Sequence, residues 1–443
     1  MRQRSTGMEK ASPGLSTEVR RPVKRKLNAG LVAALAVLIT GLAVVLNKFD
    51  VAVVDTLDKH VGDWRIALGS PRAPAQRNDI AVILIAEDTL LDYESRSPID
   101  RSLIAETIRA IDLAGPKAIG LDFIFDRRTR NDQKLIAALR EAKAPIVLGN
   151  IDERVTSIAA ESLAIQTKFI EASGRPHGHL MLARKEGFLA GNDSIVRYVA
   201  KPYDATADNP EAIVPGATRG LNGATPAASP QAFVDVLAVA AGFNHKPETR
   251  AISWLRPPDD RTPTFLTLTL PRHNPDTVKP ALEGLFLPSW REFLKGRVVL
   301  IGADMIDRDQ HTTPLSVIDK SAIPGIYIHA QALAQRIDGN RDIEILPDWI
   351  VALVSAIVAV CCFLTAHSTG VKPYGFAYGF VGLALIGAAS LCAYSYYRID
   401  FPSIALTTAW ALGGLSGLVI DWFGHRSRRA KSGRKVTEDI AAV

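Results

Sequence analysis

Charged residues are absent from four long apolar stretches of this 443-residue chain, although they make up 22% of the whole sequence. The stretches are residues 27–46, 349–366, 374–394 and 401–420. Each is close in length to the roughly 20 residues that an α-helix needs to cross a bilayer. A helix in the core of a soluble domain seldom runs so far without a charge. We therefore predict four transmembrane helices, one N-terminal and three C-terminal.

The same absence argues against transport. A charge at the centre of a bilayer costs about 2.5–3.5 kcal/mol and is kept only where it is used, so these spans are not expected to move ions or protons. Small residues occur in them instead. Gly375 and Gly379, and likewise Gly413 and Gly417, have the spacing of helices that lie close together. The sequence therefore predicts a closely packed bundle and leaves a homodimer as an alternative.

Cysteine is also scarce, and all three cysteines lie in predicted spans. Residues 47–348 are numerous enough to form an apolar core without disulfides. The chain has no glycine-rich phosphate loop, no paired-cysteine metal spacing and no nucleophile elbow. A nucleophile built from His311, Thr312 and Thr313 would rest on weak sequence support. We therefore predict neither an enzyme nor a cofactor.

Basic residues are concentrated beside the spans. Residues 1–26 hold eight Lys and Arg against two acidic residues, and residues 421–443 hold six against three. With Lys372 counted as well, residues 47–348 carry −4 of the total of +6. Because basic flanks stay in the cytoplasm, both termini are predicted inside and residues 47–348 outside. This distribution indicates contact with membrane lipid and no nucleic-acid partner.

The first apolar stretch, residues 27–46, has a second interpretation as a cleavable signal peptide. Its length exceeds that of a usual signal-peptide core, and the sequence LAVVLNKFD that ends it offers no clean small-x-small cleavage site. We therefore interpret it as an uncleaved membrane anchor.

Residues 47–348 alternate between apolar strands and helices. Strands are predicted over 80–86, 118–125, 145–150, 194–200 and 296–304, and helices over 131–143 and 231–241, with another helix ending before Gly115. Such alternation implies right-handed crossovers and a parallel sheet. The predicted fold class is α/β: a mostly parallel periplasmic sheet with flanking helices, plus the four transmembrane α-helices.

A helix with an apolar stripe is predicted directly after the first span. Val54, Leu57, Val61, Trp64 and Leu68 follow a 3-4-3-4 spacing, which places them on one side of a helix. The run covers fewer than three heptads, so a coiled coil is one interpretation and docking on the chain's own domain is the other. We favour docking on the domain.

Asp122 is the one acidic residue in the apolar run 118–125. Because burying an acid without a partner costs several kcal/mol, the residue needs either a partner or a ligand. Arg101, at the start of the preceding helix, is the partner that we predict.

Further acids follow the other predicted strands. In an open parallel sheet, ligands bind outside the carboxyl ends of the strands, and oxygen ligands suit hard cations or a cationic ligand. The candidate ligand-binding residues are Glu87, Asp88, Arg101, Asp122, Asp304, Asp307, Asp309 and His311. The alternative is that Asp122 pairs with Arg101 while the other acids cap helices or are solvated.

Several motifs occur together in an order typical of a known family. They are RSPIDRSLIAETIRAI, GPKAIGLDFIF and a D-x-x-L-I-A-A-L helix, followed by DSIVRYV, GRVVLIGADMIDRDQHTTPL and PGIYIHAQALAQRIDG. Over about residues 55–340 the sequence resembles the type 2 CHASE domain. The resemblance implies an extracellular sensory module of the kind associated with bacterial histidine kinases and cyclases.

The resemblance and the topology together predict a multi-pass sensor in the bacterial inner (cell) membrane. It would detect an unknown periplasmic ligand and relay the signal to a separate kinase, cyclase or other partner, because residues 421–443 contain no such domain. The alternative is a structural or assembly component of a cell-envelope complex with its periplasmic domain as docking surface. The predicted order is basic cytoplasmic tail 1–26, span 27–46, periplasmic domain 47–348, spans 349–366, 374–394 and 401–420, and basic cytoplasmic tail 421–443.

Overall fold

The computed structural model describes residues 52–151, 159–183, 195–199, 231–245, 250–272, 288–306, 309–369, 373–401, 403–420 and 422, together with Ala34, Leu38 and Gly41. These three isolated positions are helical, and the rest of the predicted span 27–46 lies outside the described residues. The first span therefore stays a prediction. Both predicted tails also lie outside, apart from Trp422.

A six-stranded sheet with the order β4-β3-β2-β8-β1-β7 forms the centre of the domain. Its strands are β1 (Arg77–Ala86), β2 (Ala118–Asp122), β3 (Ile146–Asn150), β4 (His177–His179), β7 (Phe265–Thr269) and β8 (Val298–Asp304). Every neighbouring pair is parallel. The position of these strands in the centre of the domain explains their continuous apolar runs, because a strand that is covered on both faces of the sheet carries apolar side chains on both faces. The predicted parallel α/β sheet is confirmed.

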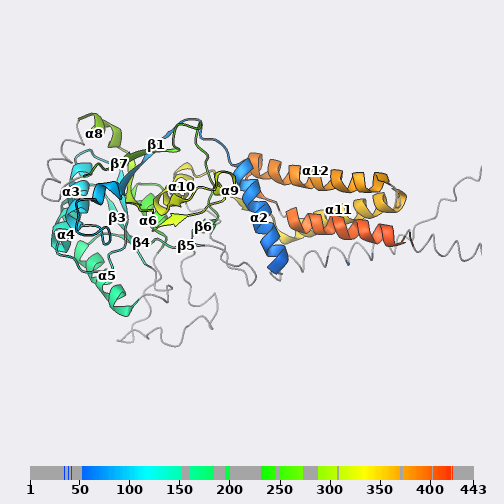
Figure 1. Cartoon of the computed structure of the whole chain (residues 1–443), viewed down its shortest axis with the longest axis horizontal. Helices are drawn as coiled ribbons and strands as arrows, with labels where there is room; N and C mark the ends of the chain where they lie inside the picture. Colours follow the sequence, from blue (N-terminus) through cyan, green and yellow to red (C-terminus); the bar gives the residue numbers. More distant parts are fainter. Residues whose placement is uncertain are drawn as a thin grey trace, which may run out of the picture.

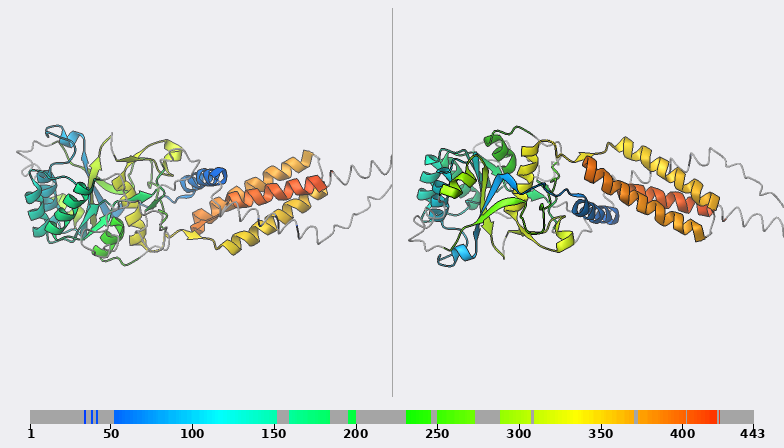
Figure 2. Two further views of the ribbon diagram at one scale, coloured as in Figure 1. Left: turned by 90° about the horizontal axis from the view of Figure 1, so that it is seen from below. Right: turned by 90° about the horizontal axis from the view of Figure 1, so that it is seen from above.

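Helices cover both faces of the sheet (Figure 1). One face carries α3 (Arg101–Asp112), α4 (Asp132–Glu141) and α5 (Ala160–Ser173), and the other carries α6 (Phe233–Ala240) and α10 (Gly325–Asp338). Side chains of β2 alternate between the two cores: Ile119 and Leu121 pack with α3 and α4, and Ala118 packs with α6 and α10. The layer of α6 and α10 lies between the sheet and the apolar C-terminal helices (Figures 1 and 2).

The strand predicted over 194–200 is largely absent. Among the described residues 195–199 only β6 (Tyr198–Val199) forms, antiparallel to β5 (Leu182–Ala183), and it does not join the central sheet. Burial does not follow the period of two that a strand requires, because Val196, Arg197 and Val199 are all buried. Arg197 contacts a different element from its neighbours, namely α2 (Ala52–Gly69).

The helix predicted after the first span is α2, but the described part of its stripe does not dock on the domain; the side chain of Val54 lies outside the described part. The exposed fractions of Leu57, Val61, Trp64 and Leu68 are 51%, 38%, 52% and 51%. Instead, α2 buries Asp63 and Ala67. The carboxylate of Asp63 forms an ion pair with Arg197 of the domain, and this contact turns the apolar side of the helix outward.

Three C-terminal helices are long and apolar enough to cross a membrane: Asp348–Ser368, Ala377–Tyr397 and Ser403–Ile420. The first two lie in α11 (Asp348–Thr369) and α12 (Pro373–Tyr397). They correspond to the three predicted C-terminal spans.

Gly413 and Gly417 line the contact between Ser403–Ile420 and α11. A Cβ at Gly413 would collide with the carbonyl oxygen of Ala359, and one at Gly417 would lie 2.7 Å from that of Phe363. The prediction of close contact is confirmed for this pair. It is wrong for Gly379, where a Cβ would meet nothing within 4 Å.

Candidate functional site

The strand register brings the predicted strand-end residues to one edge of the sheet. Ala86 at the end of β1 pairs with Asp304 of β8, and Asp122 at the end of β2 pairs with Gly302 of β8. The carboxyl ends of these three central strands therefore lie side by side. In open parallel sheets, this is the edge at which ligands bind.

Asp122 projects toward the layer of α6 and α10. Its Oδ1 lies 3.8 Å from Nε2 of His329 on α10, and the two side chains are 7% and 4% exposed. The ring of Phe233 covers the imidazole edge-on at 5.6 Å. Among the described residues, neither Oδ2 of Asp122 nor Nδ1 of His329 has a hydrogen-bond partner. We refer to these two residues as the Asp122–His329 pair.

The predicted partnership of Asp122 with Arg101 is wrong. Arg101 lies 3.6 Å from Asp132 and stacks over the ring of Phe125 at 4.6 Å, on the opposite face of the sheet. The reason is the alternation along β2. Asp122 is two residues from Gly120, whose missing side chain makes room for Phe233 and Leu237 of α6, whereas α3 covers the other face.

A second polar pair, Asp309 and His311, belongs to the same edge. Oδ1 of Asp309 lies 3.0 Å from Nε2 of His311. The backbone oxygen of Asp309 accepts a 3.1 Å hydrogen bond from the N–H of Gly325, the first residue of α10. A Cβ at Gly325 would lie 2.7 Å from Oδ1 of Asp309, so glycine is what permits this approach. The loop that carries the second pair is thereby fixed to the helix that carries His329.

The remaining predicted residues lie outside this arrangement. Glu87 forms an ion pair with Arg96 at 3.4 Å and accepts a 3.3 Å hydrogen bond from the N–H of Ile306. Asp304 accepts a 3.0 Å hydrogen bond from Gln310. Asp88 is exposed in a short 3-10 helix, and Asp307 lies outside the described residues. Glu87 and Asp304 thus fasten the loops around the edge.

Burial sets the protonation of the Asp122–His329 pair. It raises the pKa of Asp122 well above its ordinary value, and the negative charge of Asp309 raises it further. Burial lowers the pKa of His329 to about 4, although Asp309 opposes that shift. At neutral pH the imidazole is therefore neutral, and the carboxyl has an increased tendency to keep its proton. The pair offers hydrogen-bonding atoms, and a carboxylate when Asp122 ionises.

Two buried polar residues at the same edge carry weaker sequence signals than the acids. His179 ends β4 and is 1% exposed, and Asn150 ends β3 opposite it in the register. The charge of His179 contributes to the low pKa of His329. His329 itself escaped prediction because a single histidine in an apolar helix is more often a core residue. In the part of the chain that the structure describes, no group of three or more His, Cys, Asp or Glu side chains could hold a metal ion.

The parallel sheet, its polar carboxyl edge and the apolar C-terminal helices define a membrane-attached α/β domain. The family model of the CHASE2 domain matches residues 32–366, more than half of the chain. The chain therefore belongs to the CHASE2 domain family, a family of extracellular sensory domains, as the sequence motifs predicted. No curated protein and no solved structure was found to match the chain.

Proposed function

We propose that this protein is a bacterial inner-membrane sensor that detects a periplasmic ligand at the Asp122–His329 pair and relays the signal to a separate partner. The single observation that carries the proposal is the buried pair itself. Each member keeps one side-chain atom without a hydrogen-bond partner among the described residues. Such atoms are costly to bury, and a bound ligand would satisfy them.

The chemistry of the pair favours a small polar or cationic ligand. Near neutral pH the histidine is neutral, while Asp122 and Asp309 supply carboxylic oxygen atoms. A ligand that donates a hydrogen bond or carries positive charge would stabilise the ionised form of Asp122. It would thereby reverse the effect of burial on the pKa of this residue.

The first connection to the membrane runs through α10. This helix carries His329 and ends at Asp338, and the N–H of the capping residue Gly339 donates to the carbonyl of Gln335. The chain then forms β11 (Glu344–Ile345), which pairs with β12 (Ile399–Asp400) directly after α12, and enters α11 at Asp348. A shift of α10 would therefore act on the start of one membrane helix and the end of the next.

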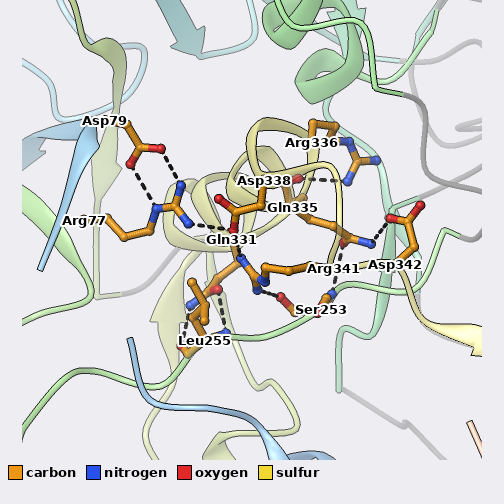
Figure 3. Close-up of polar contacts among 11 residues, drawn as sticks. Arg77, Asp79, Ser253, Leu255, Gln331, Gln335, Arg336, Asp338, Arg341 and Asp342 are labelled. Atoms are coloured by element: carbon orange, nitrogen blue, oxygen red, sulfur yellow. Dashed lines mark hydrogen bonds and ion pairs between the residues drawn. The ribbon is translucent and has the colours of Figure 1, made fainter. Parts of the chain in front are cut away.

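The second connection runs through the extended segment 253–256, which lies along α10 (Figure 3). The side chain of Gln331 exchanges hydrogen bonds of 2.9 and 2.8 Å with the N–H and carbonyl of Leu255, and Gln335 accepts a 3.1 Å bond from the N–H of Ser253. Arg256 then donates to the carbonyls of Ser70 and Pro71, directly after α2. These bonds support a relay from α10 to α2.

The receiving partner would be a kinase, a cyclase or another signalling protein that reads the position of the membrane helices. Both termini are placed in the cytoplasm on the basis of the charge distribution. Family membership supports sensing, and the two connections from the site support the relay.

The proposal can be tested on the full chain in lipid nanodiscs by thermal unfolding in the presence of small amines and polar metabolites. A ligand that binds only the folded state raises the melting temperature. The shift should disappear in Asp122→Asn and His329→Gln. It should persist in Asp260→Asn, which makes the same chemical change where the side chain is 93% exposed. An equal shift in all four proteins would place binding elsewhere. If no compound shifts the melting temperature and envelope proteins co-purify with the chain, the alternative function is favoured: a structural or assembly component of a cell-envelope complex.

A further inference from the structure

The stripe on α2 is an apolar surface that the sensory function does not explain. It consists of Leu57, Val61, Trp64 and Leu68, and we refer to it as the α2 stripe. Between 38% and 52% of each residue is exposed. Several large apolar side chains on one side of one helix form a continuous surface, and such surfaces mark a site of interaction.

The α2 stripe faces away from the sensory domain. Asp63 and Ala67 are one turn apart and fully buried, and Asp63 contacts Arg197 of the domain. At 100° per residue, the centre of the stripe lies about 110° around the helix from these two residues, so the stripe does not face the domain. The helix runs across the axis of the apolar C-terminal bundle, between that bundle and the domain (Figures 1 and 2). The stripe therefore remains exposed on a helix that lies where the bundle meets the domain.

Polar contacts fix α2 at the domain end of the bundle. Arg65 donates a 2.6 Å hydrogen bond to the carbonyl of Phe401 and forms an ion pair with Asp400, both directly after α12. Gly69 permits close contact with the same helix, because a Cβ there would lie 2.8 Å from Oγ of Ser395 and 2.9 Å from the ring of Tyr394. The stripe thus lies at the height where α12 leaves its apolar span.

Exposed aromatic residues mark the same height. Trp349 at the start of α11 is 67% exposed, and Tyr396 and Tyr397 at the end of α12 are 79% and 72% exposed. Trp and Tyr gather where lipid headgroups meet the hydrocarbon, since their rings are apolar and their polar groups remain hydrated. Trp64 of the α2 stripe would extend this aromatic belt from the bundle onto α2.

From this arrangement we propose that α2 is an interfacial helix, and that lipids of the leaflet nearest the CHASE2 domain cover the α2 stripe. Amphipathic helices bind in this way, lying in the plane of the interface with their apolar side in the boundary between headgroups and acyl chains. The helix carries three aspartates against Lys59 and Arg65. Apolar contact rather than attraction to anionic lipid therefore holds it, and zwitterionic lipid suffices. Lipid is the occupant that fits, since the stripe continues the lipid-facing surface of the bundle.

The test uses the full chain in vesicles of phosphatidylcholine, and in parallel of phosphatidylethanolamine with phosphatidylglycerol. Cys361, Cys362 and Cys392 are replaced by alanine, and a nitroxide label is attached to Val61→Cys or Trp64→Cys. His60→Cys is the matched control, an exposed position of α2 outside the stripe. Collision of each label with oxygen, which concentrates in lipid, is compared with collision with a water-soluble nickel complex.

Labels on the stripe should collide several-fold more with oxygen than with nickel, equally in both kinds of vesicle, and the His60→Cys label should show the reverse. Access to nickel at all three positions would overturn the proposal. Exclusion of both reagents from the stripe, with dipolar broadening between labels, would also overturn it in favour of a second copy. An independent measurement uses the native side chain: brominated phosphatidylcholine should quench the wild-type fluorescence more than that of Trp64→Tyr, and equal quenching would contradict lipid contact.

Discussion

Arg197 donates two hydrogen bonds of 2.7 Å, from Nε and Nη2, to the carboxylate of Asp63. Both side chains are almost fully buried, at 7% and 1% exposure. Asp63 belongs to α2 and Arg197 to the sensory domain, so this bidentate pair fastens the domain to the helix. Two residues further along, Arg65 fastens the same helix to the membrane bundle. A single turn of α2 therefore holds both halves of the molecule.

Replacing Arg197 by alanine should strongly destabilise the protein. The change would leave the buried carboxylate of Asp63 without its bidentate partner, and breaking a buried ion pair in this way costs about 3–5 kcal/mol. Arg72→Ala is the matched control, because its ion pair with Asp260 is exposed and should contribute at most about 1 kcal/mol. Thermal unfolding of the detergent-solubilised full chain measures both. Similar melting temperatures for the two variants would contradict a buried, stabilising pair.

Arg101 should couple energetically to Asp132 and not to Asp122. Double-mutant cycles would be built from Arg101→Gln with Asp132→Asn and, separately, with Asp122→Asn. Residues in one ion pair show coupling energies of about 0.5–3 kcal/mol, whereas independent sites add within about 0.5 kcal/mol. Chemical denaturation of the full chain gives the four stabilities of each cycle. Strong coupling between Arg101 and Asp122 would contradict this expectation and support the pairing that was predicted from the sequence.

Stability should depend on pH through His329. Its folded pKa of about 4 lies below its ordinary value of 6.5. The unfolded state therefore binds more protons between these values, and stability is complete above pH 6.5 and lost as the pH falls toward 4. The loss amounts to about 3 kcal/mol, at 1.36 kcal/mol per pKa unit. His329→Gln should flatten the curve of unfolding free energy against pH in this window, and an unchanged slope would contradict a neutral buried imidazole.

Asp122 should produce a slope of the opposite sign. Its folded pKa is raised above the ordinary value of 3.8, so its contribution to stability is complete below that pH and is lost as the pH rises through the raised pKa. Asn cannot ionise, so Asp122→Asn should become more stable relative to wild type as the pH rises. Asp260→Asn serves as the exposed control. The same unfolding series measured from pH 4 to 8 would detect the difference, and parallel curves would contradict it.

The third C-terminal span should tolerate no large side chain at Gly413. A leucine there would collide with the backbone of Ala359 in α11, and backbone cannot move aside as a flexible side chain can. Gly387→Leu is the matched control, since a Cβ at that position of α12 meets nothing within 4 Å. Gly413→Leu should lower the melting temperature of the solubilised chain while Gly387→Leu leaves it unchanged. Equal melting temperatures would contradict close contact between the two helices.

The architecture could be predicted because the signals for it are local and redundant. The strands β1, β2, β3 and β8 are apolar runs of the right length with helices between them, so their parallel direction needed no tertiary information. The order of the strands and the two edge strands, β4 and β7, were not predicted. The three C-terminal spans follow from the absence of charge alone. The segment 194–200 misled because its residues meet separate partners one at a time: Ile195 bridges Thr312, Tyr198 bridges Ala251 and Arg197 contacts Asp63, so no continuous ladder forms among the described residues.

The side-chain contacts in the candidate site were harder to predict than the fold, because they depend on the face of the sheet on which each side chain lies. The side chains of Arg101 and Asp122 are both buried, but they lie on opposite faces of the sheet. Arg101 is on the face that α3 covers, and Asp122 is on the face that α6 and α10 cover. Gly120 carried the relevant signal, because a glycine two residues before Asp122 marks the face that α6 approaches. His329 is far from Asp122 in sequence, and no local pattern connects them. Long-range pairing of this kind is fixed by the packing of α10 on the sheet.

The two glutamines of α10 have a consequence for motion. Gln331 and Gln335 are one helical turn apart on α10. Their side chains bond to Leu255 and Ser253, which are two residues apart in an extended segment, so the spacing on the helix matches the spacing on the segment. A slide of α10 along the segment by one residue would break all of these hydrogen bonds together. A displacement of α10 that keeps these hydrogen bonds would therefore carry the segment with it.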